Sequence, residues 1–113
     1  MRVLAGDIGG TSTRLCTAEC TDGVCRLRRT QQFASARYTG LAEILGEFLQ
    51  QESVPSFDAV CLAVAGPVRS TSAGQSAKIT NLPWEIWSVV LAQTFGFSRI
   101  RLINDFEAIG YGL

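Results

Sequence analysis

A nine-residue apolar run, FDAVCLAVA at residues 57–65, constrains the fold of this 113-residue chain more than any other feature. It is far shorter than the roughly 18 apolar residues that a membrane span requires. It also lacks the polar–apolar alternation of a strand with one solvated face. Because Pro55 precedes it and Gly66-Pro67 follows it, we expect a short central strand of a parallel sheet, covered on both faces.

A strand over residues 3–8 and a long β-hairpin are predicted before this run. Residues 13–20 and 24–33 form the hairpin, because the Asp22-Gly23 dipeptide between them favours a two-residue turn. A two-residue turn fixes the pairing along both strands. The predicted pairs nearest the turn are Thr21–Val24, Cys20–Cys25, Glu19–Arg26 and Ala18–Leu27.

This register gives the hairpin two different faces. Small apolar groups share one face, and the other holds Glu19, Arg26, Thr17 and Arg28. The register also makes Cys20 and Cys25 neighbours, so that a strained disulfide can form on oxidation. Two reduced thiols in the core are the simpler interpretation, since disulfides are uncommon in the cytoplasm.

Two helices are predicted from apolar spacing and from residues that cap helix ends. The first covers residues 40–52, is capped near Thr39, and has an apolar face formed by Leu41, Ile44, Leu45, Phe48 and Leu49. The second covers residues 83–95, with Pro83 in its first turn and Gly96 as its C-cap. Its inner face is expected to consist of Ile86, Val89 and Val90.

The remaining elements complete a mixed α/β sheet in the order β-β-β-α-β-α-β-α. Residues 69–78 are polar and are expected to form a mobile loop or an irregular hairpin. Residues 99–103 form the last strand, followed by a helix that begins at Asp105 and runs off the chain end. A natural domain seldom stops inside an amphipathic segment, so we expect a fragment.

The composition excludes several classes of function. Ten basic and ten acidic residues give a net charge of zero, which argues against nucleic-acid and acidic-membrane partners. The chain has no His, the commonest general base and zinc ligand, and its four cysteines form no C-x-x-C pair. Asp7 interrupts the N-terminal apolar segment too early for a secretory leader, so we expect a cytoplasmic protein.

A first candidate site lies where the first strand ends. It comprises Gly6, Asp7, Ile8, Gly9, Gly10 and Thr11. Adjacent glycines let backbone N–H groups approach an anion, and Thr11 and Thr13 add hydroxyl donors. Asp7 would repel bare phosphate, so we expect it to hold Mg²⁺, directly or through water. An ordinary glycine hairpin turn is the alternative, although an unpaired carboxylate in the buried end of a strand would then be costly.

Two more candidate sites follow. Asn104 and Asp105 come directly after a predicted strand, where ligands bind in open α/β sheets. Asp105 is suited to accept a proton from an alcohol and Asn104 to bind a hydroxyl, with a plain helix N-cap as the alternative role for Asp105. Residues 78–84 form the third site, with Thr80 and Asn81 as its candidate ligands. The structural alternative is a helix-entry turn that Asn81 or Thr80 caps and against which Trp84 packs.

Taken together, the motifs resemble those of the bacterial glucokinases, within the actin/hexokinase-like sugar kinases. They are DIGGT-x-x-R, AVAGPV, ITNLPW and INDFEAI, and they span the chain in order. The resemblance implies a ribonuclease H-like, actin-like ATPase lobe that is incomplete at its C-terminal end. It also implies transfer of the ATP γ-phosphoryl group to the 6-hydroxyl of D-glucose, and a homodimeric parent protein.

The resemblance also implies a role for each matching residue. Residues 6–11 match the ATP-phosphate loop, and Asp7 matches its Mg²⁺-associated carboxylate. Asp105 matches the catalytic base. The implied sugar ligands are Asn104, Asp105, Thr80 and Asn81.

On the same resemblance, residues 1–113 form only the N-terminal lobe of a two-lobed kinase. The second lobe would supply the adenosine pocket, a second phosphate loop and the Glu and His residues that hold the sugar. We therefore expect the chain alone to be inactive and to self-associate through uncovered apolar surface. The alternatives are a sugar-responsive repressor, which would carry a helix-turn-helix before the first strand, and a non-catalytic binding domain.

Overall fold

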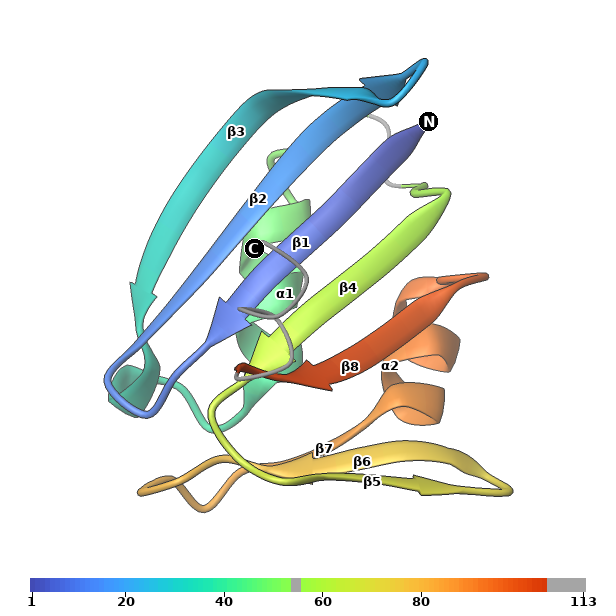
Figure 1. Ribbon diagram of the computed structural model, residues 1–113. Helices are drawn as coiled ribbons and strands as arrows, with labels where there is room; N and C mark the ends of the chain where they lie inside the picture. Colours follow the sequence, from blue (N-terminus) through green and yellow to red (C-terminus); the bar gives the residue numbers. More distant parts are fainter. Residues whose placement is uncertain (54–55, 106–113) are drawn as a thin grey trace.

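The computed structural model describes residues 1–53 and 56–105, and Figure 1 shows how their elements are arranged. The strands are β1 (Arg2–Ile8), β2 (Ser12–Thr21), β3 (Val24–Ala34), β4 (Ala59–Val64), β5 (Val68–Thr71), β6 (Gly74–Lys78), β7 (Glu85–Trp87) and β8 (Ile100–Asn104). The helices are the 3-10 turn η1 (Ser35–Arg37), α1 (Leu41–Leu49) and α2 (Ser88–Phe95). The helix expected after Asp105 lies outside the described residues.

The strands form two sheets. The larger has the order β3-β2-β1-β4-β8, in which β4 runs parallel to β1 and β8, and the hairpin strands are antiparallel. The smaller sheet, β5-β6-β7, is antiparallel and lies below the larger one in Figure 1. The predicted mixed α/β class and the central position of the apolar run are therefore confirmed.

Both helices lie on the same face of the larger sheet (Figure 1). The buried side chains of β4 are Val60, Leu62 and Val64, whereas Ala59, Cys61 and Ala63 on its other face are half-buried. Of the two faces, α1 and α2 cover only the one that carries Val60, Leu62 and Val64. The side chains on that face of β4 are all small.

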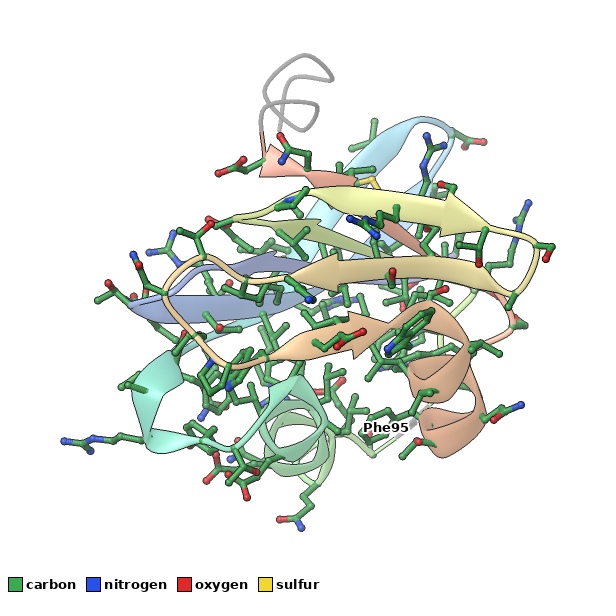
Figure 2. All side chains as sticks on the ribbon, turned by 90° about the horizontal axis from the view of Figure 1, so that it is seen from below. Phe95 is labelled. Carbon is green, nitrogen blue, oxygen red and sulfur yellow. A yellow bond between two sulfur atoms is a disulfide. The ribbon has the colours of Figure 1, made fainter. Side chains whose placement is uncertain are left out.

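The core fills the space between the larger sheet and the helices. In Figure 2, Phe95 lies at the C-terminal end of α2, and its ring stacks on that of Phe97 with centroids 5.6 Å apart. Burial of each large apolar side chain contributes roughly 1.5–3 kcal/mol. The largest fully buried apolar side chains are Phe48, Leu4, Ile8, Leu15, Ile44, Leu45, Leu62, Leu102 and Val64.

The N-cap of helix α1 lies one residue later than predicted. Gly40 is the N-cap and makes no side-chain hydrogen bond, so the expectation of a Thr39 cap is wrong. Instead, the Thr39 N–H donates to the Glu43 carboxylate at 3.3 Å, which uses a first-turn acidic side chain to satisfy a backbone donor. In the described residues, no helix has both the length and the apolar character needed to cross a membrane.

The predicted hairpin register is confirmed next to its turn. All four predicted pairs from Thr21–Val24 to Ala18–Leu27 are present, and Asp22 and Gly23 have positive φ angles of 53° and 80°. The register shifts at Thr17, which pairs with Arg29 and leaves Arg28 as the extra residue of a bulge. The placement of Thr17 on the exposed charged face is therefore wrong, because Thr17 is buried.

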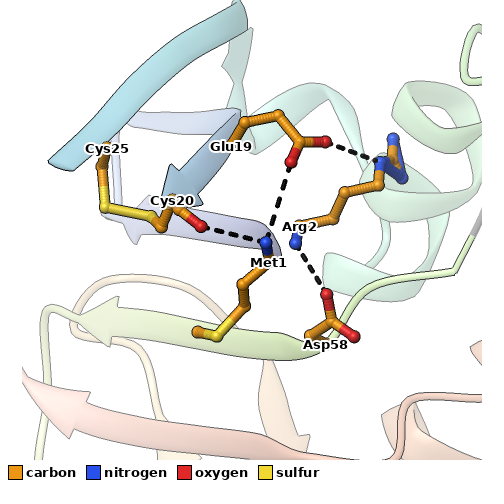
Figure 3. The surroundings of a disulfide bond; sticks show 6 residues. All are labelled: Met1, Arg2, Glu19, Cys20, Cys25 and Asp58. Atoms are coloured by element: carbon orange, nitrogen blue, oxygen red, sulfur yellow. Dashed lines mark hydrogen bonds and ion pairs between the residues drawn. A yellow bond between two sulfur atoms is a disulfide. The ribbon is translucent and has the colours of Figure 1, made fainter. Parts of the chain in front are cut away.

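Cys20 and Cys25 form a disulfide, so the expectation of two reduced core thiols is wrong (Figure 3). Their Cα atoms are 4.0 Å apart because they are a directly paired couple of the hairpin. Cys25 is exposed, since the hairpin tip extends beyond the helices, and its neighbours Val24 and Leu27 are 62% and 67% exposed. The pair therefore crosslinks a surface hairpin.

Two predictions between β4 and β8 are wrong. Residues 69–78, expected to be mobile or irregular, form the regular hairpin β5–β6. The second helix starts at Ser88, because Trp84 and Ile86 alternate with exposed residues and form strand β7 and its approach. Consequently Val89 and Val90, the predicted inner face, are 39% and 51% exposed.

The predicted C-cap of the second helix is confirmed. Gly96 adopts the left-handed conformation, with φ 74° and ψ 27°, and its N–H donates to the Ala92 carbonyl. Phe97 follows with its own N–H bonded to Ala92 at 3.0 Å, and the chain then enters β8.

Candidate functional site

The carboxyl ends of β1 and β4 meet at one edge of the larger sheet and are joined there by backbone hydrogen bonds. The Ala65 N–H, just after β4, donates to the Ile8 carbonyl at 2.9 Å. The Thr80 N–H donates in turn to the Ala65 carbonyl at 3.0 Å. The loop after β6 is therefore attached to the turn after β4, and that turn to the end of β1.

Glycines allow these segments to approach more closely than other residues would. A Cβ atom on Gly10 would lie 2.7 Å from the Thr80 carbonyl oxygen, and one on Gly66 would lie 1.9 Å from that of Lys78. Both contacts are with backbone, which cannot rotate away as a side chain can. The glycine turn after β1 is thus in direct contact with the loop that carries Thr80 and Asn81.

The end of β8 joins the same edge through a side chain. The Asn104 amide Nδ2 donates to the Gly66 carbonyl oxygen at 2.8 Å. Asp105 follows immediately and is half-buried. The structure therefore brings Asn104 to the turn that carries Gly66, next to the other two predicted sites.

Thr80 and Asn81 occupy a turn between β6 and β7 and not a helix entry. The Leu82 N–H donates to the Ile79 carbonyl at 3.2 Å, and Asn81 has a positive φ of 69°, which Asn tolerates better than most residues. Both Thr80 and Asn81 are exposed. A helix cap is excluded as their role, because α2 starts at Ser88.

Ser35 supports the inner side of the glycine turn, and no motif in the sequence marks this residue. The Ser35 hydroxyl donates to the Gly9 carbonyl at 2.7 Å, and its N–H donates to the Thr11 carbonyl at 3.1 Å. The Thr13 hydroxyl lies 2.9 Å from the Ser35 hydroxyl, and both residues are fully buried. Thr13 was expected to offer its hydroxyl to a ligand, and this is wrong because that hydroxyl faces the interior.

Asp7 lies on the opposite side of β1 from its neighbours Gly6 and Ile8. Ile8 is fully buried, and a Cβ atom on Gly6 would lie 2.8 Å from side-chain atoms of Leu15 and Leu62. Asp7 itself is exposed, so the expectation of a buried carboxylate is wrong. Among the described residues its carboxylate makes no hydrogen bond or ion pair, although Arg14 is its cross-strand neighbour.

One exposed carboxylate beside an amide-rich turn is compatible with Mg²⁺. This ion keeps several waters and is commonly held by one or two carboxylates together with substrate phosphates. In the part of the chain that the structure describes, no group of three or more His, Cys, Asp or Glu residues is placed to hold a metal ion. The donor set thus suits a cation that arrives with a phosphorylated ligand.

A second overlooked residue, Gln75, supports the strand that leads to Asn104. Its side-chain amide donates to the Leu102 carbonyl at 2.9 Å and accepts from the Leu102 N–H at 2.8 Å. The Gln75 side chain therefore makes the two backbone hydrogen bonds that a neighbouring strand would make to Leu102. The polar composition of residues 69–78 predicted a loop, and no local sequence signal marks such a pairing.

Trp84 anchors the Thr80–Asn81 turn to the segment that contains Ser35. Its indole N–H donates to the Tyr38 carbonyl at 3.4 Å, and the Tyr38 N–H donates to the Ser35 carbonyl at 3.1 Å. The Tyr38 hydroxyl bonds to the Glu47 carboxylate, which raises the pKa of Tyr38. The Thr80–Asn81 turn is therefore linked to Ser35 through a chain of hydrogen bonds.

Comparison with known proteins decides the family. A family model described as Glucokinase matches residues 4–113. The chain belongs to the glucokinase family. The glucokinase of Nostoc punctiforme is 39% identical over 113 residues, which cover 98% of this chain and 32% of that protein.

Solved glucokinase structures share the fold. Glucokinase from an Antarctic psychrotroph matches with a TM-score of 0.82 at 30% identity, over 97% of this chain and 34% of that one. Glucokinase from Balamuthia mandrillaris, solved in complex with glucose, matches with a TM-score of 0.65 at 24% identity, over 98% and 31%. The chain spans about a third of the length of these glucokinases, and the predicted fold class is confirmed.

Proposed function

We propose that this chain is the N-terminal lobe of a two-lobed glucokinase that transfers the ATP γ-phosphoryl group to the 6-hydroxyl of D-glucose. One observation carries the proposal: the glycine turn, the Thr80–Asn81 turn and Asn104 meet at one sheet edge, joined through Ala65 and Gly66. These segments hold the four motifs that resemble the family. Membership of the glucokinase family and the names of its relatives support the reaction.

Asp105 is the proposed general base. Its carboxylate accepts the proton of the glucose 6-hydroxyl while that oxygen forms a bond to the γ-phosphorus, and the bond from phosphorus to the departing ADP oxygen breaks. Asn104 offers an amide to a sugar hydroxyl, and Thr80 and Asn81 are proposed as further sugar contacts. Their exposure and their contact with the glycine turn support this role.

Residues 6–11 are the proposed binding segment for ATP phosphates. Backbone N–H groups later in the turn, at Gly10 and Ser12, are the proposed donors, since the Gly9 N–H already donates to the Ser12 carbonyl at 3.0 Å. Gly6 and Ile8 position the turn, because their side-chain positions face the core and their backbone is paired with β2 and β4. Asp7 is the residue proposed to hold Mg²⁺. When bound, the ion neutralises charge that develops on the phosphate oxygens.

The remaining proposals concern location, assembly and the isolated chain. ATP and glucose 6-phosphate are cytoplasmic metabolites of glycolysis, so we place the parent protein in the cytoplasm. The resemblance to the glucokinases supports the proposal that it is a homodimer. Residues 1–113 alone should show no turnover, since positioning supplies most of phosphoryl-transfer catalysis and the second lobe provides much of it. They should also self-associate, which sedimentation with and without ATP would detect.

The test is glucose phosphorylation by the full-length protein, measured by coupling ADP formation to NADH oxidation. Asp105→Asn should lower kcat on the order of 10³-fold, the usual contribution of a positioned general base, with an unchanged circular dichroism spectrum. The matched control is Asp22→Asn, at the exposed tip of the hairpin, where Asn also tolerates the positive φ of 53°. It should retain full activity.

Two results would contradict the proposal. Activity of Asp105→Asn within tenfold of the unsubstituted protein would remove Asp105 as the base. A full-length protein that binds glucose in a calorimetric titration but transfers no phosphoryl group from ATP would favour the regulatory alternative.

A further inference from the structure

The glycine turn contains a peptide group that has little intrinsic preference for its direction. The peptide between Gly9 and Gly10 is flanked by two residues without Cβ atoms, so steric opposition to its rotation is small. Its direction matters for an anion, because its N–H attracts phosphate oxygens and its carbonyl repels them. Some other part of the molecule has to fix this direction.

We propose that Ser35 is the positioning residue that fixes it, an inference that rests on the phosphate-binding role proposed above. The Ser35 hydroxyl binds the Gly9 carbonyl at 2.7 Å, and the Ser35 N–H binds the Thr11 carbonyl at 3.1 Å. In a trans peptide the carbonyl and the following N–H point in opposite directions. The N–H groups of Gly10 and Ser12 are therefore directed away from Ser35.

The hydroxyl chain beneath the turn has only one consistent arrangement of protons. Since the Ser35 proton is donated to Gly9, the Ser35 oxygen accepts the proton of the Thr13 hydroxyl, 2.9 Å away. Each bond polarises the next, which strengthens the hold on the Gly9 carbonyl. Both side chains are fully buried, so water does not replace a lost partner at no cost.

The rest of the Ser35 environment keeps the hydroxyl in place. Its own carbonyl accepts the Tyr38 N–H at 3.1 Å, and the Tyr38 carbonyl accepts the indole N–H of the buried Trp84 at 3.4 Å. Ser35 therefore sits on a rigid turn that is braced by the segment leading to β7. The position is suited to orienting the glycine turn and is too deeply buried to touch a ligand.

The experiment compares variants of the full-length protein in steady-state kinetics and in calorimetric titrations with magnesium ATP and with glucose. Ser35→Ala should raise the KM and the dissociation constant for magnesium ATP about tenfold, the equivalent of one hydrogen bond. The KM and dissociation constant for glucose should stay within twofold. Thr13→Val removes only the hydroxyl that donates to Ser35, and it should raise the dissociation constant for magnesium ATP about threefold. This second variant tests the proposal if Ser35→Ala does not fold.

Two buried hydroxyls elsewhere provide matched controls. Ser76→Ala on β6 and Thr17→Val on β2 should lower the melting temperature without changing either dissociation constant more than twofold. An unchanged magnesium ATP dissociation constant in Ser35→Ala, or an equal loss of glucose affinity, would overturn the role of Ser35. Absence of magnesium ATP binding in the unsubstituted protein would instead overturn the phosphate site and Ser35 with it.

Discussion

The two ends of strand β2 are held in place by different kinds of interaction. At the glycine turn, the neutral and fully buried hydroxyls of Thr13 and Ser35 form short hydrogen bonds. At the hairpin tip, the Cys20–Cys25 disulfide lies beside an ion pair of Glu19 with Arg2 at 3.7 Å (Figure 3). The side chains of that ion pair are 36% and 26% exposed.

The difference follows from what each end has to do. An exposed ion pair contributes about 0–1 kcal/mol and tolerates small changes of angle. A buried hydroxyl with one proton specifies both a partner and a direction, and a broken bond leaves an unsatisfied group. At the end of β2 that adjoins the candidate site, hydrogen bonds therefore fix the direction of backbone groups. At the other end, the disulfide and the ion pair only hold the strands together.

The largest effect is expected at the site end, from Gly66→Ala. Because its Cβ atom would lie 1.9 Å from the Lys78 carbonyl, the junction between the turn after β4 and the loop after β6 has to separate. The free energy of unfolding should fall by about 3 kcal/mol or more, measured by urea denaturation.

Gly46→Ala in α1 is the matched control for that substitution. Nothing lies within 4 Å of the added Cβ, so stability should rise by roughly 0.5–1 kcal/mol as a helical glycine is removed. Equal effects of the two substitutions would show that the junction is not tightly packed.

A moderate effect is expected from Gln75→Ala, which removes the amide that pairs with Leu102. Both Leu102 backbone groups lose a partner, and the free energy of unfolding should fall by about 2 kcal/mol in urea denaturation. Gln93→Ala, on the exposed side of α2, should change it by no more than about 0.5 kcal/mol. A Gln75 variant as stable as the Gln93 variant would mean that solvent satisfies the β8 edge equally well.

The smallest effect is expected at the hairpin tip, from reduction of the disulfide. The bond closes a loop with a sequence separation of only 5, so its loss should lower the free energy of unfolding by about 1 kcal/mol, at the low end for disulfides. Reduction should leave the magnesium ATP dissociation constant of the full-length protein unchanged within twofold. A larger change would show that the two ends of β2 are coupled.

Thiol alkylation checks the redox state in the same samples. Burial raises the pKa of Cys16 and of Cys61 above its usual value of 9.0, so both should react slowly at neutral pH and faster as the pH rises beyond 9. After oxidation and denaturation, alkylation should modify Cys16 and Cys61 but not Cys20 or Cys25.

The sequence predicted those parts of the fold that depend on local signals. Asp22-Gly23 fixed the hairpin register as far as Ala18, because a two-residue turn dictates the pairs next to it. The bulge at Thr17 had no such signal. For β7 two local signals compete: buried Trp84 and Ile86 alternate with exposed Glu85 and Trp87, as in a strand, whereas Pro83 is typical of a helix start.

The motifs were visible in the sequence, whereas the residues that support them were not. Asn104 lies at the end of a parallel strand, as predicted, and the structure brings Thr80 and the glycine turn to the same sheet edge. Ser35 and Gln75 were missed, because each acts on the backbone of a segment distant in sequence. A serine after a strand and a glutamine in a polar stretch are too common to indicate such contacts.

The junction at the sheet edge is made almost entirely of main-chain groups and glycines. Ala65, Thr80 and Ile8 are linked through atoms that every amino acid possesses. Exchange of the Thr80 side chain therefore leaves the scaffold intact. Substitutions at a few exposed positions can therefore change the acceptor molecule during evolution while the fold stays the same.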